Sequence, residues 1–171
     1  MEKCDVLVVG AGASGSVAAL KAAKEGLKTI VIEKKKKPGD AQTRIDITRD
    51  SGITEIVQEL KLEIGDHSNM SRWFSPKDSF ILNSKIGDYF VKRGQAEDSF
   101  EVSTIRKAED FGAELITGVK IDKVKKEGNL VKELTLNSGE VISPSHIIVA
   151  AGQEPDVLRK HKIHLEEKNP I

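Results

Sequence analysis

Short apolar runs, separated by glycine-rich and polar segments, define the start of the chain. Residues 4–9 (CDVLVV) are apolar at five of six positions, which predicts a strand buried on both faces. The glycine-rich residues 10–15 and an alanine-rich stretch of helical spacing follow, and Gly26 fits the end of that helix. Residues 28–32 predict a second strand that ends at Glu33. We expect a strand–turn–helix–strand unit whose two strands are parallel neighbours.

The pattern is weaker between residues 40 and 95. Residues 53–62 predict a helix, whereas 71–77 (SRWFSPK) predict a loop that holds the only tryptophan. Short strands are expected at 80–82 and 89–91.

Strand patterns dominate the second half, after a helix expected at 96–111 and capped by Gly112. β-forming runs begin at residue 114 and continue through 130–136, and the Asn-Ser-Gly turn at 137–139 leads into a short strand. Residues 119–142 therefore predict an antiparallel β-meander. Residues 145–150 (SHIIVA) predict a buried strand closed by Gly152, and the polar tail, about 156–171, is expected to fray.

The glycine turn carries the strongest chemical signal. Gly10, Gly12 and Gly15 form a GxGxxG motif that follows a strand, opens a helix and precedes an acid at the end of the next strand. In a dinucleotide-binding fold, these glycines serve the tight turn, the approach of the pyrophosphate and the helix–strand packing, respectively. Glu33 would accept hydrogen bonds from the ribose hydroxyls and would repel a 2′-phosphate. The alternative is a glycine-rich turn in an ordinary α/β protein.

The motif alone does not separate FAD from NAD. A late strand that returns beside the first one, preceded by a meander, is typical of two-dinucleotide flavoproteins, whereas NAD-binding domains continue with further βα units. We therefore expect an α/β, Rossmann-like dinucleotide-binding fold with a parallel sheet and an inserted antiparallel β-meander. FAD is the expected cofactor and NAD the alternative.

Composition and charge exclude several other classes of protein. The 171 residues carry 27 basic and 27 acidic side chains, so a basic nucleic-acid binder is not expected. Cys4 is the only cysteine, which excludes an internal disulfide, and no thiolate cluster or other metal site is expected. Apolar runs are too short for a transmembrane segment, and the N-terminus lacks a secretory signal pattern, so a cytoplasmic protein is expected.

Three stretches resemble the N-terminal FAD-binding part of geranylgeranyl reductase-type flavoproteins, in the para-hydroxybenzoate hydroxylase-like superfamily. They are DVLVVGAGASGSVAALKAAKEGLKTIVIEK, YFVKRGQAEDSFEVSTIRKAEDFGAELITGVKIDKV and SHIIVAAGQEPDVLRKHKI. The resemblance implies FAD bound by the glycine turn and Glu33, with Lys34 beside the adenosine. It further implies that the loop at 39–41 runs towards the flavin and that the backbone near Lys120 and Ile121 contacts the adenine. The candidate cofactor-binding residues are Gly10, Gly12, Ala13, Ser14, Gly15, Glu33, Lys34, Ile121, Ala150 and Gly152.

Three departures from that family stand out. Ala150-Ala151-Gly152 replaces the common Ala-Asp-Gly, and the frequent cysteine motif after the second strand is absent. Family members also continue into a substrate-binding sheet and a Gly-Asp motif beyond the length of this chain. We therefore expect a single FAD/NAD-binding domain, 1–171, that lacks the C-terminal substrate-binding part.

Two functions follow from the resemblance. The preferred one is an FAD-dependent oxidoreductase that passes hydride from reduced flavin to isoprenoid double bonds of a small-molecule or prenyl-lipid substrate. The other is a non-catalytic FAD-binding module, or one completed by a partner chain or homo-oligomer. An NAD-binding dehydrogenase domain is the third reading. No catalytic residue is assigned.

Several further residues admit two interpretations. Asp40, Arg44 and Asp46 are expected in a polar loop that either faces the flavin or is solvated. Arg93 fits a cofactor contact or, preferably, a surface salt bridge. The lysines at 34–37 favour a solvated turn over a peripheral contact with acidic lipids. Trp73 and Phe74 favour core packing over a role at the flavin. The histidine pair His161 and His164 favours solvent over a metal, and buried Cys4 is expected to pack as a small hydrophobe.

Overall fold

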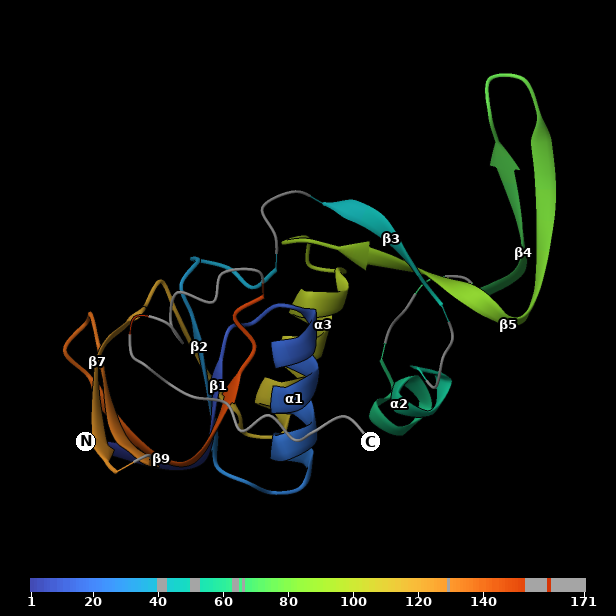
Figure 1. Cartoon of the computed structure of the whole chain (residues 1–171). Coiled ribbons are helices and arrows are strands. Elements are labelled where there is room, and N and C mark those ends of the chain that lie inside the picture. Colours follow the sequence, from blue (N-terminus) through green and yellow to red (C-terminus); the bar gives the residue numbers. More distant parts are fainter. Residues whose placement is uncertain are drawn as a thin grey trace.

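A computed structural model describes residues 1–39, 43–49, 53–62, 65, 67–128, 130–152 and 160. In that part of the chain, the main sheet has six strands in the order β6-β2-β1-β9-β8-β7 (Figure 1). Their bounds are β1 Glu2–Val9, β2 Thr29–Glu33, β6 Glu114–Thr117, β7 Ile121–Glu127, β8 Leu130–Leu136 and β9 Val141–Val149.

The main sheet joins a parallel half to an antiparallel half. Strands β6, β2, β1 and β9 pair in parallel, and β9, β8 and β7 pair as the predicted antiparallel meander. Strand β9 returns beside β1, with Val9 opposite Val149. The expected Rossmann-like α/β fold with an inserted meander is confirmed. The short strand expected after the 137–139 turn and the buried strand expected at 145–150 are wrong as separate elements. One strand, β9, runs through Pro144, and its residues 145–149 are exposed or half-buried.

Helices α1 (Ala13–Lys24) and α3 (Phe100–Asp110) pack together and cover one face of the sheet, and the meander curls over the other (Figure 1). In β1, Val6 and Val8 pack into the helix-side core, and Leu7 and Val9 pack into the meander-side core. Because both faces are covered, the second half of the strand, residues 6–9, is apolar and buried throughout. Helix α3 starts later than expected because Ser99 caps its N-terminus and accepts from the N–H of Val102.

A second, three-stranded antiparallel sheet has the order β3-β5-β4. Its strands are β3 Arg44–Arg49, β4 His67–Phe74 and β5 Ser79–Arg93, and helix α2 (Ile53–Leu60) lies between β3 and β4 in the chain. The tips of β4 and β5 project from the body as a hairpin arm (Figure 1).

This second sheet corrects four predictions. Residues 71–74 are strand, not loop, and the two short strands at 80–82 and 89–91 are parts of one long strand, β5. Arg44 and Asp46 lie in strand β3 and not in a polar loop, while Asp40 lies outside the described residues. Core packing of Trp73 and Phe74 is wrong as well, because the two residues are 54% and 76% exposed. The helix expected at 53–62 is confirmed as α2.

Candidate cofactor site

A cleft of about 1080 Å³ opens where three neighbouring strands end. Strands β1, β2 and β9 bring their carboxyl ends to its floor, at Val9, Glu33 and Val149. The chain leaves β1 towards β2 on one side, whereas β9 returns on the other side. This switch in strand order opens a crevice at the carboxyl edge, where open α/β sheets bind ligands.

The glycine turn at the floor leaves no space for side chains at two positions. Gly10 has φ +104°, and a Cβ on it would lie 2.5 Å from the carbonyl oxygen of Ala150. A Cβ on Gly15 would lie 1.8 Å from the carbonyl oxygen of Gly10. The turn therefore depends on glycine at both positions, which lets α1 and β9 approach β1 closely.

Gly12 is different, because a Cβ there would meet nothing within 4 Å. It faces the open cleft and is the N-cap of α1, with no side-chain capping hydrogen bond and no acidic residue in the first turn. The first N–H groups of a helix have no partner inside the helix, and they carry its positive end. This terminus is therefore suited to an anionic group such as a pyrophosphate.

Glu33 is 7% exposed and ends β2 at the cleft. Its Oε2 accepts from the N–H of Ala11 at 2.7 Å, and its Oε1 accepts from the N–H of Lys35 at 2.9 Å. These two bonds orient the carboxylate. Since each carboxylate oxygen has two lone pairs, both oxygens can accept a second bond from a ribose hydroxyl.

Positive charge dominates the walls. Among the described residues, six basic and two acidic side chains line the cleft: Lys34, Lys35, Arg44, Arg93, Lys120, Lys160, Glu33 and Glu101. The two carboxylates already accept hydrogen bonds from protein groups. A cleft of this kind attracts an anionic ligand.

Arg93 forms salt bridges, as preferred from the sequence, but they do not lie on the open surface. It pairs with Asp46 and with Glu101, which is 1% exposed, and both Arg93 and Glu101 line the cleft. Sequence reasoning missed Glu101, because it lies among the polar residues of an amphipathic helix. No signal in its own helix could have found it, because its partners, Arg93 and Gly94, lie at the end of β5 and just after it.

Nine of the ten candidate residues line the cleft. They are Gly10, Gly12, Ala13, Ser14, Glu33, Lys34, Ile121, Ala150 and Gly152. The tenth, Gly15, is buried behind the turn. That these residues bind the cofactor stays a prediction. Residue 41, His161 and His164 lie outside the described residues.

The described residues contain no group of three or more His, Cys, Asp or Glu side chains placed to hold a metal ion. Among the helices they form, none has the length and apolar character needed to cross a membrane.

Comparison with known proteins defines the family. The family model described as FAD dependent oxidoreductase matches residues 5–167, which is nearly the whole chain. This chain belongs to that family. FAD is thus the cofactor that the family assigns to it, in place of the alternative NAD.

Two curated relatives are similar over most of this chain. Digeranylgeranylglycerophospholipid reductase 3 of Methanosphaera stadtmanae is 29% identical over 93% of this chain and 42% of its own length. Protein FixC of Escherichia coli is 28% identical over 86% of this chain and 36% of its own length. The chain therefore spans about two fifths of the length of these relatives.

Solved structures agree with this assignment. A geranylgeranyl bacteriochlorophyll reductase-like protein of Thermoplasma acidophilum has a TM-score of 0.71 and 28% identity, covering 91% of this chain and 41% of that one. PqsL, a probable FAD-dependent monooxygenase of Pseudomonas aeruginosa, has a TM-score of 0.78 at 18% identity, covering 99% of this chain and 48% of that one, and shows the fold alone. The resemblance to geranylgeranyl reductase-type flavoproteins is confirmed.

The cleft fits FAD on its own geometry. The open space at Gly12 and the uncapped start of α1 suit the diphosphate, and the oriented carboxylate of Glu33 suits a ribose with free hydroxyls.

Proposed function

We propose that this chain is the FAD-binding part of a flavin-dependent reductase of the geranylgeranyl reductase type, which acts on the double bonds of isoprenoid or prenyl-lipid substrates. The observation that carries the proposal is the cleft at the carboxyl ends of β1, β2 and β9, in a chain 28–29% identical to two reductases of that description. FAD, when bound and reduced, supplies the hydride for a carbon–carbon double bond.

The residues of this chain bind and orient the cofactor. On this proposal, the N-terminus of α1 at Gly12 holds the diphosphate, and Glu33 holds the adenosine ribose with Lys34 beside it. The backbone at Ile121 lies along the adenine, and that at Ala150 and Gly152 closes the floor. Arg93 lies in the wall, where its guanidinium can meet an anionic part of the cofactor.

A partner-completed or non-catalytic FAD module is the second candidate. The observation in its favour is that the chain spans only 36% and 42% of the two curated relatives. On this view, the chain binds FAD, and the substrate contacts come from another polypeptide segment.

One experiment separates the candidates. The purified full chain is loaded with FAD, freed of excess cofactor and inspected for the absorption bands of protein-bound oxidised flavin. It is then reduced anaerobically with dithionite, freed of excess reductant and mixed with a geranylgeranyl lipid, or with its fully saturated analogue as control.

Each outcome decides between them. Reoxidation by the unsaturated lipid only, with hydrogenated product found by mass spectrometry, supports the reductase. Flavin that binds but stays reduced with both lipids supports the module and contradicts the reductase for this chain. Absence of bound flavin contradicts both candidates.

A further inference from the structure

A buried carboxylate, Glu101, is among the residues that line the cleft. Glu101, in the first turn of α3, is 1% exposed. Its Oε1 accepts from Nε of Arg93 at 2.7 Å and lies 2.6 Å from Nη2 of the same side chain. Its Oε2 accepts from the N–H of Gly94 at 3.2 Å. Both oxygens therefore hold the end of β5, where Arg93 faces the cleft.

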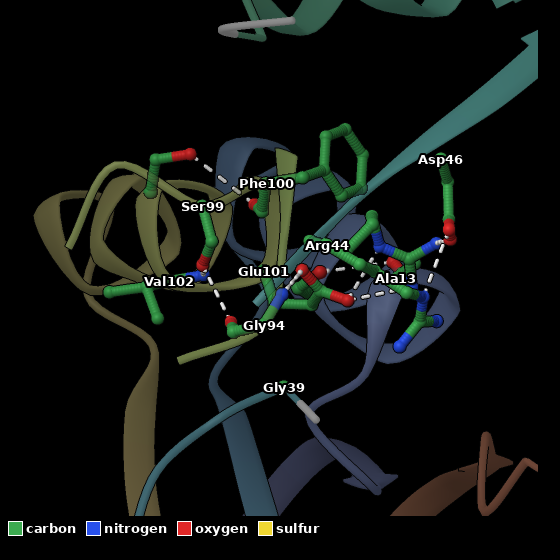
Figure 2. A network of polar contacts seen from close by, with 12 residues as sticks. Ala13, Gly39, Arg44, Asp46, Gly94, Ser99, Phe100, Glu101 and Val102 are labelled. Atoms are coloured by element: carbon green, nitrogen blue, oxygen red, sulfur yellow. Dashed lines mark hydrogen bonds and ion pairs between the residues drawn. The ribbon is translucent and has the colours of Figure 1, made fainter. Parts of the chain in front are cut away.

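The ion pair belongs to a larger network of charged side chains, in which Figure 2 labels Glu101, Asp46 and Arg44. Nη1 of Arg93 lies 3.2 Å from Oδ2 of Asp46, and Oδ1 of Asp46 accepts from Nε of Arg44 at 2.9 Å. Arg93 is thus held on two sides by carboxylates, from α3 and from β3. A guanidinium gripped in this way has one orientation, because its donors form a rigid planar fork.

The same carboxylate is packed against the loop that follows the lysine run. A Cβ on Gly39 would lie 2.3 Å from the carbonyl oxygen of Gly94 and 3.4 Å from Cβ of Glu101. The N–H of Gly39 donates to the carbonyl oxygen of Ala11 at 3.3 Å. One continuous set of contacts therefore runs from the glycine turn through Gly39 to the Glu101–Arg93 pair.

Stability alone does not explain this pair. A buried ion pair is often no more stabilising than apolar residues of the same volume. The N-terminus of α3 already has its cap in Ser99, so Glu101 is not needed there. What the pair achieves is to fix a cation at one place and in one orientation in the wall of a cleft that suits an anionic cofactor.

We propose that Glu101 is a positioning residue for the cofactor site: it does not touch FAD, but holds the guanidinium of Arg93 in the orientation in which Arg93 meets the anionic part of the cofactor. This inference rests on the proposed function of the cleft as an FAD site.

The chain offers a matched control. Glu97 and Arg106 form a second Glu–Arg pair next to the same helix, with side chains 75% and 57% exposed and outside the cleft. Glu97→Gln and Arg106→Lys thus make the same chemical changes in a solvated pair. Exposed pairs contribute little, so neither variant should change FAD affinity.

The test is a double-mutant cycle on FAD affinity of the full chain, with Glu101→Gln, Arg93→Lys and the double variant. Arg93→Lys keeps a counter-charge for buried Glu101 but loses the fork. We expect Glu101→Gln to weaken FAD binding about tenfold, a loss of about 1.4 kcal/mol. In the Arg93→Lys background, Glu101→Gln should cause no further loss, because the group that it positions is already gone.

The salt dependence of FAD affinity is a second measurement. A purely structural role of Glu101 would leave it unchanged. A guanidinium–phosphate contact makes FAD affinity fall as ionic strength rises. The fall should be shallower in Glu101→Gln than in the parent chain and unchanged in Glu97→Gln. If Glu101→Gln does not fold, the salt dependence of FAD affinity is compared between Arg93→Lys and Arg106→Lys. This comparison tests whether the guanidinium of Arg93 contacts the cofactor. Equal slopes in the two variants overturn the proposal.

The other outcomes are also decisive. Equal losses from Glu101→Gln in both backgrounds, or an unchanged salt dependence, overturn the positioning role while FAD binding itself stands. If the parent chain binds no FAD, the proposed function itself is contradicted. That result is obtained before any variant is made, so it is distinct from a failure of the positioning role.

Discussion

The backbone N–H of Ala11 donates to Oε2 of Glu33 over 2.7 Å, so the glycine turn and the end of β2 share one buried hydrogen bond. The other carboxylate oxygen accepts from the N–H of Lys35. The acid that would hold the ribose is therefore also the acid that fixes the turn beside it. Loss of Glu33 should affect both the fold of the turn and the cofactor.

Glu33→Ala should weaken FAD binding by about 1–3 kcal/mol, the cost of leaving buried polar partners unpaired. Glu33→Gln should lose less, because its carbonyl oxygen can still accept one of the bonds. FAD titration followed by the quenching of flavin fluorescence measures both. Unchanged affinity in Glu33→Ala would show that the ribose is not held there.

Asp5→Ala is the control for the structural part of that loss. Oδ2 of Asp5 accepts from the N–H of Lys28 at 2.8 Å, which is the same kind of carboxylate–backbone bond between the same two segments. Asp5 lies near the middle of β1, beside the residue that precedes β2, and does not line the cleft. Asp5→Ala should lower the unfolding free energy slightly and leave FAD affinity unchanged.

The sequence predicted the glycine turn and the acid at the end of β2, but it did not predict the β4–β5 arm. The glycine turn and the acid after the next strand have fixed spacing, because backbone geometry demands it. In the β4–β5 arm, Ser71 faces Leu82 and Arg72 faces Ile81, so apolar residues stand on both faces. Without an alternation of buried and exposed positions, the pattern carries no period of two, and the strand β4 was missed.

Glu101 was unpredictable for a different reason. Its burial depends on three segments that meet only in the folded chain, namely the end of β5, the start of α3 and the loop at Gly39. Within each segment alone, a charged residue beside apolar neighbours is expected to face the solvent. Long-range pairing of a charged residue leaves no local signature in the sequence.

A phenylalanine on the arm and one in the core differ strongly in burial. Phe74 is 76% exposed on the arm, and Phe100 is 8% exposed in the helix-side core. Phe74→Ala should change the unfolding free energy by no more than about 0.5 kcal/mol. Phe100→Ala should lower it by about 3–5 kcal/mol. Urea denaturation of both variants measures the difference, and a large loss from Phe74→Ala would mean that the arm is packed in solution.

The stability of the fold should fall at alkaline pH because of Cys4. Burial raises the pKa of this thiol from 9.0 to about 11. Since the pKa is higher in the folded state, the contribution of Cys4 is fully present below pH 9 and is lost as the pH rises towards 11. At about 1.4 kcal/mol for each unit of pKa difference, the full loss is about 3 kcal/mol, of which about 2 kcal/mol is reached near pH 11.

Other groups titrate in the same range, so the measurement is a difference between variants. Unfolding free energies of the parent chain and of Cys4→Val are compared at pH 8 and near pH 11. The parent should lose more than the variant, which has no thiol to ionise. Equal losses would show that Cys4 is not responsible.

Gly12 and Gly15 separate what the turn does for the fold from what it does for the cofactor. A Cβ on Gly15 would lie 1.8 Å from the carbonyl oxygen of Gly10, whereas a Cβ on Gly12 would meet open cleft. Gly15→Ala should therefore destabilise the cofactor-free chain, by about 1–3 kcal/mol or more, as overpacking does.

Gly12→Ala should change the stability of the cofactor-free chain by only a few tenths of a kcal/mol to about 1 kcal/mol, because φ is −78° and only an N-cap glycine is replaced. It should nevertheless weaken FAD binding strongly, since the methyl group would occupy the space of the diphosphate. Thermal unfolding without FAD and FAD titration of both variants test this, and normal FAD affinity in Gly12→Ala would place the diphosphate elsewhere.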